Sequence, residues 1–461
     1  MIIDFLFTLN FYEAILLFTL LISCLYYLAE NYSSNKWYNI FKPSNLYTLL
    51  ILFYCVIGPI FSSADSDGSI IYRATDHREY YQVGLFAAFI SYFSFQIGFN
   101  YKNNFSIKSF GLNKLKINNL NKDNVLFIHK WAERIILFTW ICQILIYGSS
   151  LLNTIIFIQN VSPIQESIAG YQGSFTAYIS YAVNFFIPGL VLMFISLLKG
   201  SREYNKFIFY LLSTTGLFLT LGFRYRLFIL YFPLFLIYFF YKKIKPSIKI
   251  LSIGLTSAFL ILGLVQVTRS YGQGLNFNIK TEETIYKNPE NQKSLLSKSF
   301  KAAFFDSNIF NTSAALISIT PKEYEHVGLA PVLNAIALPI PRKLWPNKPT
   351  GSYMVDIYRI IYEGVFWEVG AACLGFAEYY LAGGWIALIL MNIFIGMFYK
   401  KIWQWFIHNF GDPIAQVTYS LYLGYLYILF SRGYLLQLVF IYFSIFIPLL
   451  YFSRIWNKRF N

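Results

Sequence analysis

The chain alternates long apolar stretches with short polar connections, and one polar interruption is far longer than the others. About eleven stretches hold roughly 18 or more residues with few charges, the length that a helix needs to cross the ~30 Å core of a bilayer. They lack the period of two that is typical of barrel strands. The pattern predicts an all-α polytopic membrane protein with spans at residues 7–28, 44–61, 82–99, 133–152, 177–198, 206–222, 225–241, 248–267, 384–403, 414–430 and 434–452.

The long polar interruption divides the chain into three parts. Residues 1–267 are expected to form an N-terminal bundle of about eight spans, and residues 384–461 a C-terminal bundle of about three. Residues 268–383 form one large loop between the eighth and ninth spans. Apolar residues recur at helical spacing between Ser294 and Thr320, which predicts short helices that lie flat on the membrane or roof a cavity.

Composition and charge agree with a membrane protein. The chain is 57% hydrophobic and only 13% charged, which excludes an ordinary soluble protein. Its net charge of +15 would also suit a nucleic-acid partner, but most of the cations lie in alternate connections. Cytoplasmic loops carry such an excess of lysine and arginine, so we expect no nucleic acid, an N-terminus outside, a C-terminus inside and the long loop on the outer face. The basic connections are residues 100–132, 199–206, 242–249, 400–401 and 454–459.

A smaller set of cations falls on the predicted outer face, at or near the ends of spans. An arginine near the hydrocarbon costs ~2.5 kcal/mol or more at a helix centre unless it is paired. A planar guanidinium suits bidentate contact with phosphate, although each arginine alone could instead extend to lipid headgroups or pair with a carboxylate. Together these residues predict a phosphate or pyrophosphate site at the outer leaflet: Arg224, Arg226, Arg269, Arg342, Lys348 and Arg432.

Four prolines stiffen residues 338–349 of the long loop. Proline fixes its own φ and favours an extended conformation for the residue before it. Arg342 and Lys348 are therefore expected to project from a stiff segment, which loses little entropy on binding. Trp345 and Trp367 either lie at the membrane interface or stack against a sugar ring.

The sequence contains no cluster with metal-ligand spacing. The four histidines, at positions 77, 129, 326 and 408, are scattered, and the four cysteines lie in apolar surroundings. We therefore expect neither a metal ion nor another cofactor. His326 is the only histidine of the long loop, and an unperturbed pKa of ~6.5 suits it to proton transfer, although a solvated loop histidine has the same appearance.

The proline segment carries a resemblance to a known family. Pro341-Arg342, Trp345-Pro346 and Lys348-Pro349 resemble the PR-x-x-W-P-x-K-P segment of Wzy-type O-antigen and oligosaccharide repeat-unit polymerases. Residues 375–380 and 383–384 are similar to the Gly-x-x-Glu segment that leads those proteins into their next span. The resemblance implies a GT-C-like, metal-independent glycosyltransferase of the bacterial inner membrane. Such an enzyme moves a growing glycan from undecaprenyl pyrophosphate to the non-reducing end of a new lipid-linked repeat unit.

The resemblance also suggests roles for the outer-face residues. Fixed arginines, Arg342 among them, would stabilise the pyrophosphate leaving group. Glu378 matches the family segment and is favoured over His326 as the base for the acceptor hydroxyl, although Glu378 could instead pair with Arg342 or Arg432. The expected partners are the lipid-linked oligosaccharide and membrane lipid; whether a regulator protein sets chain length is left open.

Two other functions stay open at the level of sequence. An O-antigen ligase-like glycan transferase has similar architecture and differs in its acceptor. A flippase or transporter for lipid-linked oligosaccharide is a different class. It should line both halves of its cavity with cations, and it has no need for a loop of about a hundred residues.

Overall fold

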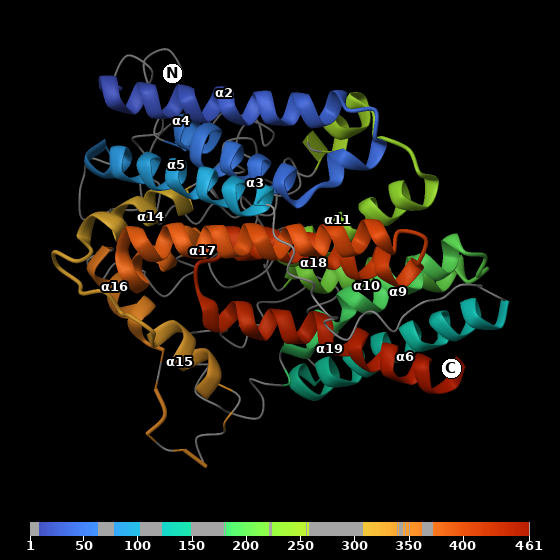
Figure 1. Cartoon of the computed structure of the whole chain (residues 1–461). Coiled ribbons are helices and arrows are strands. Elements are labelled where there is room, and N and C mark those ends of the chain that lie inside the picture. The colour runs from blue at the N-terminus through green and yellow to red at the C-terminus, as the bar shows by residue number, and fades with distance from the viewer. Residues whose placement is uncertain are drawn as a thin grey trace, which may run out of the picture.

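A computed structural model describes most of the chain. The described residues are 9–62, 78–101, 122–148, 179, 181–220, 224–254, 256–257, 308–338, 340, 344–345, 347–349, 351–361 and 372–460. They form helices and the turns between them, and no strand occurs in these ranges. The long helices run side by side in layers, with α2 (Phe11–Ser33) along one edge of the molecule (Figure 1).

Eight helical segments in the described ranges are long and apolar enough to cross a membrane. Two of them are composite: a π-helical turn, Leu52–Ile57, joins α3 (Pro43–Ile51) to α4 (Gly58–Ser62), and a 3₁₀ turn, η5 (Tyr181–Phe185), precedes α9 (Phe186–Leu198). The others are α2, α5 (Arg78–Asn100), α11 (Arg224–Lys242), α17 (Gly375–His408), α18 (Pro413–Ser431) and α19 (Leu435–Phe460).

The sequence predicted more spans than these eight. Two predicted spans correspond to α6 (Lys122–Tyr147) and α10 (Tyr204–Thr220), which lie beside the eight without belonging to them. Most of the predicted span 248–267 lies outside the described residues. The all-helical, polytopic architecture is therefore confirmed, and the described residues hold eight candidate spans by length and composition.

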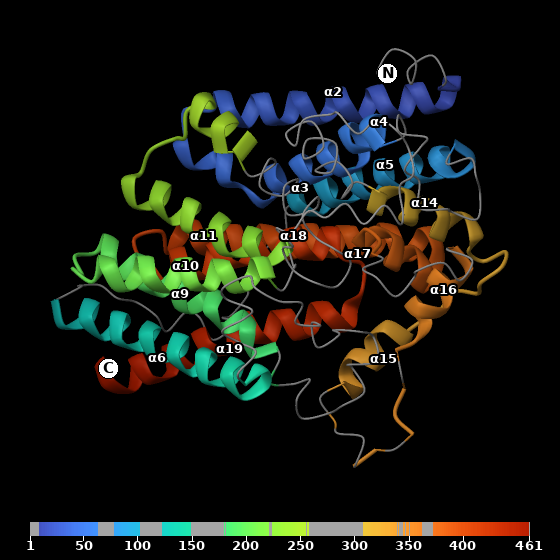
Figure 2. The ribbon, with the colours of Figure 1, turned by 180° about the vertical axis from the view of Figure 1, so that it is seen from behind.

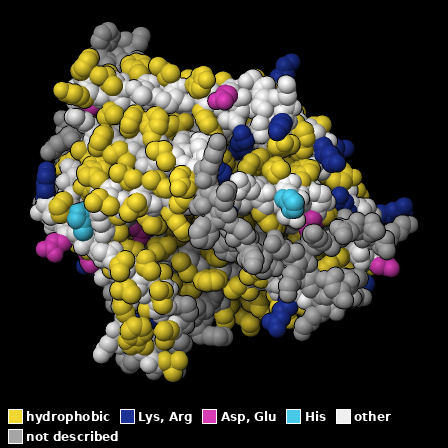
Figure 3. All heavy atoms as spheres, in the orientation of Figure 1, with side chains coloured by type: hydrophobic (Ala, Val, Ile, Leu, Met, Phe, Trp, Pro, Cys, Tyr) yellow, Lys and Arg dark blue, Asp and Glu magenta, His cyan; other side chains and the backbone are white. Residues whose placement is uncertain are grey.

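The two ends of the helix bundle differ in charge. At one end, which we name the basic end, Lys400 donates a 2.7 Å hydrogen bond to the carbonyl of Tyr101, and Lys199 lies 5.4 Å from the ring centre of Tyr241. Lysines and arginines gather on that side of the surface in Figure 3, where the C-terminus lies in Figure 1.

The opposite end, which we name the loop end, holds the described part of residues 268–383. Its helices are α14 (Asn308–Ile319), α15 (Ala330–Ala337) and α16 (Tyr353–Ile361). Figure 2 shows α14, α15 and α16 from behind, on the side away from the C-terminus. The described parts of the long segment and of the lysine-rich connections thus lie at opposite ends of the bundle, as alternating spans require.

α14 is part of the bundle rather than a helix on its surface. Phe310 and Leu316 are fully buried, and a Cβ at Gly84 of α5 would approach the ring of Phe310 to 2.9 Å. The apolar spacing that predicted this helix therefore marks its contact with the spans. Residues 294–307, which carry the rest of that pattern, lie outside the described residues.

α5 and α17 cross at a contact that two glycines make possible. A Cβ at Gly396 would lie 2.3 Å from the carbonyl oxygen of Phe95, and one at Gly98 would lie 2.1 Å from that of Ile393. Beside this crossing, the Asn392 side-chain oxygen accepts hydrogen bonds from Tyr47 at 2.8 Å and Ser91 at 3.1 Å. Small residues at the contact and satisfied polar groups are how helices associate in a medium without water.

Candidate functional site

The loop end brings together segments that are far apart in the sequence. Its centre is Glu378, in the first turn of α17, whose side chain is only 2% exposed. The hydroxyl of Tyr353, from α16, donates a 2.7 Å hydrogen bond to Oε1 of Glu378. The backbone N–H of Leu435, where α19 begins, donates to the same oxygen at 2.9 Å. We name Glu378, Tyr353 and Leu435 the carboxylate cluster.

The chain before α17 is fixed on both sides, and this fixes Glu378. The amide of Leu374 donates to Oγ of Ser313 in α14 at 2.7 Å. On the other side, the amide of Gly433 donates to the carbonyl of Cys373 at 2.7 Å. A carboxylate in the first turn of a helix is also stabilised by the free amides at that end. The first turn of α17 is therefore anchored both to α14 and to the turn between α18 and α19.

The groups around Glu378 stay protonated. Burial raises the pKa of Tyr353 far above its usual range, and the charge of Glu378 raises it further. Burial and then the same charge raise the pKa of Cys373 to about 12 and also raise the pKa of Tyr434. Tyr353 can therefore act only as a neutral hydrogen-bond donor near pH 7, and the two donors of the carboxylate cluster, Tyr353 and the amide of Leu435, are both uncharged.

Two arginines meet at one tyrosine nearby. Arg226 is 1% exposed, and its Nε donates a 3.1 Å hydrogen bond to the side-chain oxygen of Asn184 in η5. The guanidinium of Arg226 lies 5.5 Å from the ring centre of Tyr225, and that of Arg432 lies 5.8 Å from the same centre. We name Arg226, Arg432 and Tyr225 the arginine cluster.

The two clusters are joined through a few residues of chain. Arg432 is the C-cap of α18, and its amide donates to the carbonyl of Ile428 at 2.9 Å. Leu435, three residues later, donates its amide to Glu378. The short turn between α18 and α19 therefore carries a cation of one cluster and a hydrogen-bond donor of the other.

The arginines predicted from sequence divide into two groups. Arg226, in the first turn of α11, and Arg432, at the C-cap of α18, are brought together at Tyr225. Arg269, Arg342, Trp367 and the side chain of Arg224 lie outside the described residues.

The proline segment folds back on itself. Lys348 is 4% exposed, and its amino group donates to the carbonyls of Leu338 at 3.2 Å and Ile340 at 2.9 Å. Lys348 was expected to project outward, and this was wrong, because the backbone carbonyls beside the prolines need donors that proline cannot supply. Trp345 is 42% exposed, so its ring is open to a membrane interface or a ligand.

His326 lies against the kink of α17. Its Nδ1 is 3.4 Å from the carbonyl oxygen of Leu381, and its ring centre is 5.7 Å from that of Tyr380. The kink follows at Gly383 and Gly384, where the φ of Gly384 is +65°. Leu381 is about one helical turn after Glu378. Both residues predicted as bases therefore belong to the same part of α17, with Glu378 buried and His326 exposed.

Several residues of the site carry no distinctive signal in the sequence. Tyr353 is one of 38 tyrosines, and Asn184 and Tyr225 lie in predicted spans without a motif. The amide of Leu435 acts through the backbone, so no side-chain pattern could reveal it. These partners depend on tertiary contacts that sequence periodicity does not encode.

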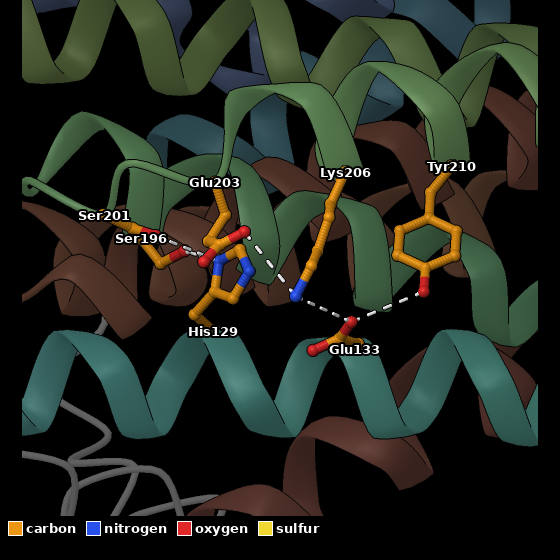
Figure 4. Close-up of polar contacts among 7 residues, drawn as sticks. All are labelled: His129, Glu133, Ser196, Ser201, Glu203, Lys206 and Tyr210. Carbon is orange, nitrogen blue, oxygen red and sulfur yellow. Dashed lines mark hydrogen bonds and ion pairs between the residues drawn. The ribbon is translucent and has the colours of Figure 1, made fainter.

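A second polar cluster lies at the basic end and joins α6, α9 and α10 (Figure 4). Nδ1 of the buried His129 is 3.1 Å from Oγ of Ser196, and Lys206 lies 3.5 Å from both Glu133 and Glu203. Burial lowers the pKa of His129, and the charges of the two glutamates oppose that shift. A neutral histidine bonded to a serine, beside a separate ion-pair network, serves here to hold three helices together.

The described residues contain no group of three or more His, Cys, Asp or Glu side chains placed to hold a metal ion. Comparison of the chain with models of known protein families, with characterised proteins and with solved structures found no match.

Proposed function

We propose that this protein is a polysaccharide repeat-unit polymerase of the bacterial inner membrane. It would transfer a growing glycan from undecaprenyl pyrophosphate to the non-reducing end of a new lipid-linked repeat unit. The observation that carries the proposal is that Arg226 and Arg432 lie against one ring, next to the carboxylate cluster and at the loop end of the bundle. In this proposal the loop end and the N-terminus face outward and the basic end faces the cytoplasm.

The arginine cluster suits the leaving group of that reaction. As the bond between the anomeric carbon and the pyrophosphate oxygen breaks, its electron pair moves to that oxygen, and the negative charge there grows. Guanidinium groups held in place before the reaction stabilise this charge at little cost of reorganisation. Arg342, which belongs to the motif that resembles the family, is proposed as a further pyrophosphate contact, together with Arg224 and Arg269; Lys348 is left out because its amino group is buried against backbone carbonyls.

The burial of Glu378 supports a positioning role for this residue. Its carboxylate holds Tyr353 and the amide of Leu435, and thereby the turn that carries Arg432. His326 is exposed at the kink of the same helix, so its ring can reach a bound acceptor. We therefore assign proton removal from the acceptor hydroxyl to His326 and keep Glu378 as the second candidate for that step.

Substitutions of Glu378 and His326 distinguish the two assignments. Glu378→Gln keeps an oxygen that accepts from Tyr353 and Leu435 but cannot take a proton near pH 7, so a positioning role predicts substantial remaining activity. His326→Ala should then lower the transfer rate by about 10²–10⁴-fold, the usual contribution of general base catalysis. Purified lipid-linked substrate and gel separation of the products measure both rates. Loss of activity in Glu378→Gln together with normal activity in His326→Ala would reverse the assignment.

An exposed apolar face at the loop end supports contact with a lipid carrier. On α15 and just before it, Leu329 is 71%, Leu333 56% and Ile336 67% exposed. Leu344 of the proline segment is 78% exposed. An apolar face of this kind suits the boundary of headgroups and acyl chains, where a polyprenyl chain would enter beside the arginine cluster.

Cells that lack the protein test the proposal against the alternatives. Single repeat units on the cell surface are expected for a polymerase, whereas repeat units held inside would indicate a flippase. Full-length polymer lacking only its transfer to the final acceptor would indicate a ligase. In complemented cells, Arg342→Ala should abolish chain extension without loss of membrane insertion, and Arg342→Lys should rescue poorly if the contact is bidentate. Near-normal glycan length in both variants would show that Arg342 is not part of the site.

A further inference from the structure

A groove at the basic end lies between two segments more than 350 residues apart, and no part of the proposed reaction uses it. It runs between the connection from α2 to α3 and the last turns of α17, and it measures about 480 Å³. Sites for small ligands have volumes of ~300–1,000 Å³. Its lining residues are Lys36, Tyr38, Asn39, Lys42, Trp403, Gln404, Ile407 and His408.

Aromatic contacts hold the walls of the groove in place. The connection contains the 3₁₀ turn η1 (Trp37–Phe41). The ring of Trp37 lies 5.4 Å from that of Phe410 in an edge-to-face arrangement, and the ring of Tyr38 lies 6.0 Å from that of Trp403. Trp403 is only 9% exposed, so it forms the floor. The groove is therefore built by packed side chains and does not depend on a bound ligand.

The polar side of the groove is cationic. Lys42 is held by a 2.9 Å hydrogen bond from its amino group to the side-chain oxygen of Asn31. Burial lowers the pKa of Lys42, the nearby charge of Lys36 lowers it further, and Glu30 opposes both. Two ammonium side chains thus line one groove, with Glu30 as the carboxylate that acts on Lys42. An anion between them would offset their repulsion.

We infer that this groove binds the phosphate group of an amphiphile or a free phosphate ion, with Lys36 and Lys42 as its ligands and Trp403 beneath them. Asn39, Gln404 and His408 supply further hydrogen-bond donors around the anion. Tyr38, Trp403 and Ile407 form an apolar wall that suits the glycerol and upper acyl carbons of an anionic phospholipid. Basic pockets between helices at the cytoplasmic side of a membrane bind such headgroups.

Binding measurements on the full-length protein in detergent test this. Native mass spectrometry would count bound short-chain phosphatidylglycerol, with phosphatidylcholine as the lipid without net charge, and titration calorimetry would measure inorganic phosphate. The double variant Lys36→Gln/Lys42→Gln should bind the anion about 25-fold more weakly, since each lysine near a membrane surface contributes ~1 kcal/mol, or about fivefold. Lys242→Gln/Lys243→Gln removes two exposed charges from the same end and should bind as the wild type does.

The outcomes identify the source of the phosphate or reject the site. Preference for phosphatidylglycerol over phosphate identifies a lipid headgroup, whereas binding of phosphate without preference for the lipid identifies a free ion. Either conclusion also requires that the Lys36/Lys42 variant binds the anion more weakly. Equal binding by this variant and its control overturns the proposal. If the double variant does not insert, Lys36→Gln alone, at an exposed position, must show a loss of about fivefold, and Lys42→Arg must keep binding.

Discussion

The hydroxyl of Tyr353 donates a hydrogen bond of 2.7 Å to Glu378, and this bond ties a helix of the long connecting segment to the first turn of α17. The amide of Leu435 completes the junction by donating to the same oxygen. Three parts of the chain therefore depend on one buried carboxylate. A buried polar group that loses a donor destabilises a protein by more than the bond itself contributes, because the group stays desolvated.

Tyr353→Phe should lower stability without removing a charge. The variant keeps the ring and removes one of the two donors to Oε1 of Glu378, so we expect the free energy of unfolding to fall by about 1–3 kcal/mol, the usual cost of leaving a buried polar group short of a partner. Thermal unfolding of the detergent-purified protein measures the change. Tyr324→Phe, at a half-buried tyrosine of the same end, is the matched control. Equal melting temperatures for the two variants would show that the bond contributes nothing.

Hydropathy predicted the spans because the bilayer imposes length and apolarity on them, but it placed some helix ends wrongly. The span expected at 384–403 is the part of α17 that follows the kink; the helix itself begins at Gly375. Its first turns contain Glu378, and the Gly383-Gly384 pair looks like a loop in sequence. α6 likewise begins at Lys122, eleven residues before the predicted start at 133, because charged residues on one side of a helix lower its mean hydropathy.

The candidate site was predictable only in part. The charge pattern identified Arg226 and Arg432 because an unpaired arginine near the hydrocarbon is energetically costly. In the structure both guanidinium groups lie near the ring of Tyr225. The hydrogen bond between Glu378 and Tyr353 could not be predicted. That choice depends on which helices pack side by side, and a long polar segment offers many partners of equal sequence plausibility.

Arg226→Lys should impair chain extension although it preserves the charge. Lysine cannot reproduce the 3.1 Å hydrogen bond from Nε to Asn184 while it also lies flat near the ring of Tyr225. Loss of a charged hydrogen bond corresponds to about 1.5–3 kcal/mol, or roughly 10–100-fold in rate. Polymer length with purified lipid-linked substrate measures the effect. Arg359→Lys, at an arginine whose side chain is 58% exposed, should extend glycan normally; equal loss in both variants would contradict a specific role.

Gly396→Ala should separate α5 from α17. The new Cβ would lie 2.3 Å from the carbonyl oxygen of Phe95, which belongs to a backbone that cannot move without shifting the helix. Overpacking of this kind costs about 1–3 kcal/mol, so the melting temperature in detergent should fall by about 1–3 °C. Gly411→Ala is the control, since a Cβ there would meet no atom within 4 Å. A fall of equal size in the control would attribute the effect to glycine itself and not to the crossing.

Asp412→Asn should remove a pH dependence of stability that originates at the basic end. Asp412 caps α18 by accepting a 2.9 Å hydrogen bond from the amide of Ile414, and burial raises the pKa of its carboxyl to about 7, against the lowering effect of that bond and of Lys199. In the unfolded chain the pKa is ~3.9, so the folded state binds the proton more tightly between about pH 4 and pH 7. The contribution to stability is therefore complete below pH 4, and it is lost as the pH rises to 7. Asparagine caps a helix as well as aspartate does but does not titrate, so the fall in melting temperature from pH 5 to pH 8 should be smaller in the variant. If the melting temperature falls equally with pH in the wild type and in Asp412→Asn, Asp412 ionises as readily in the folded protein as in the unfolded chain.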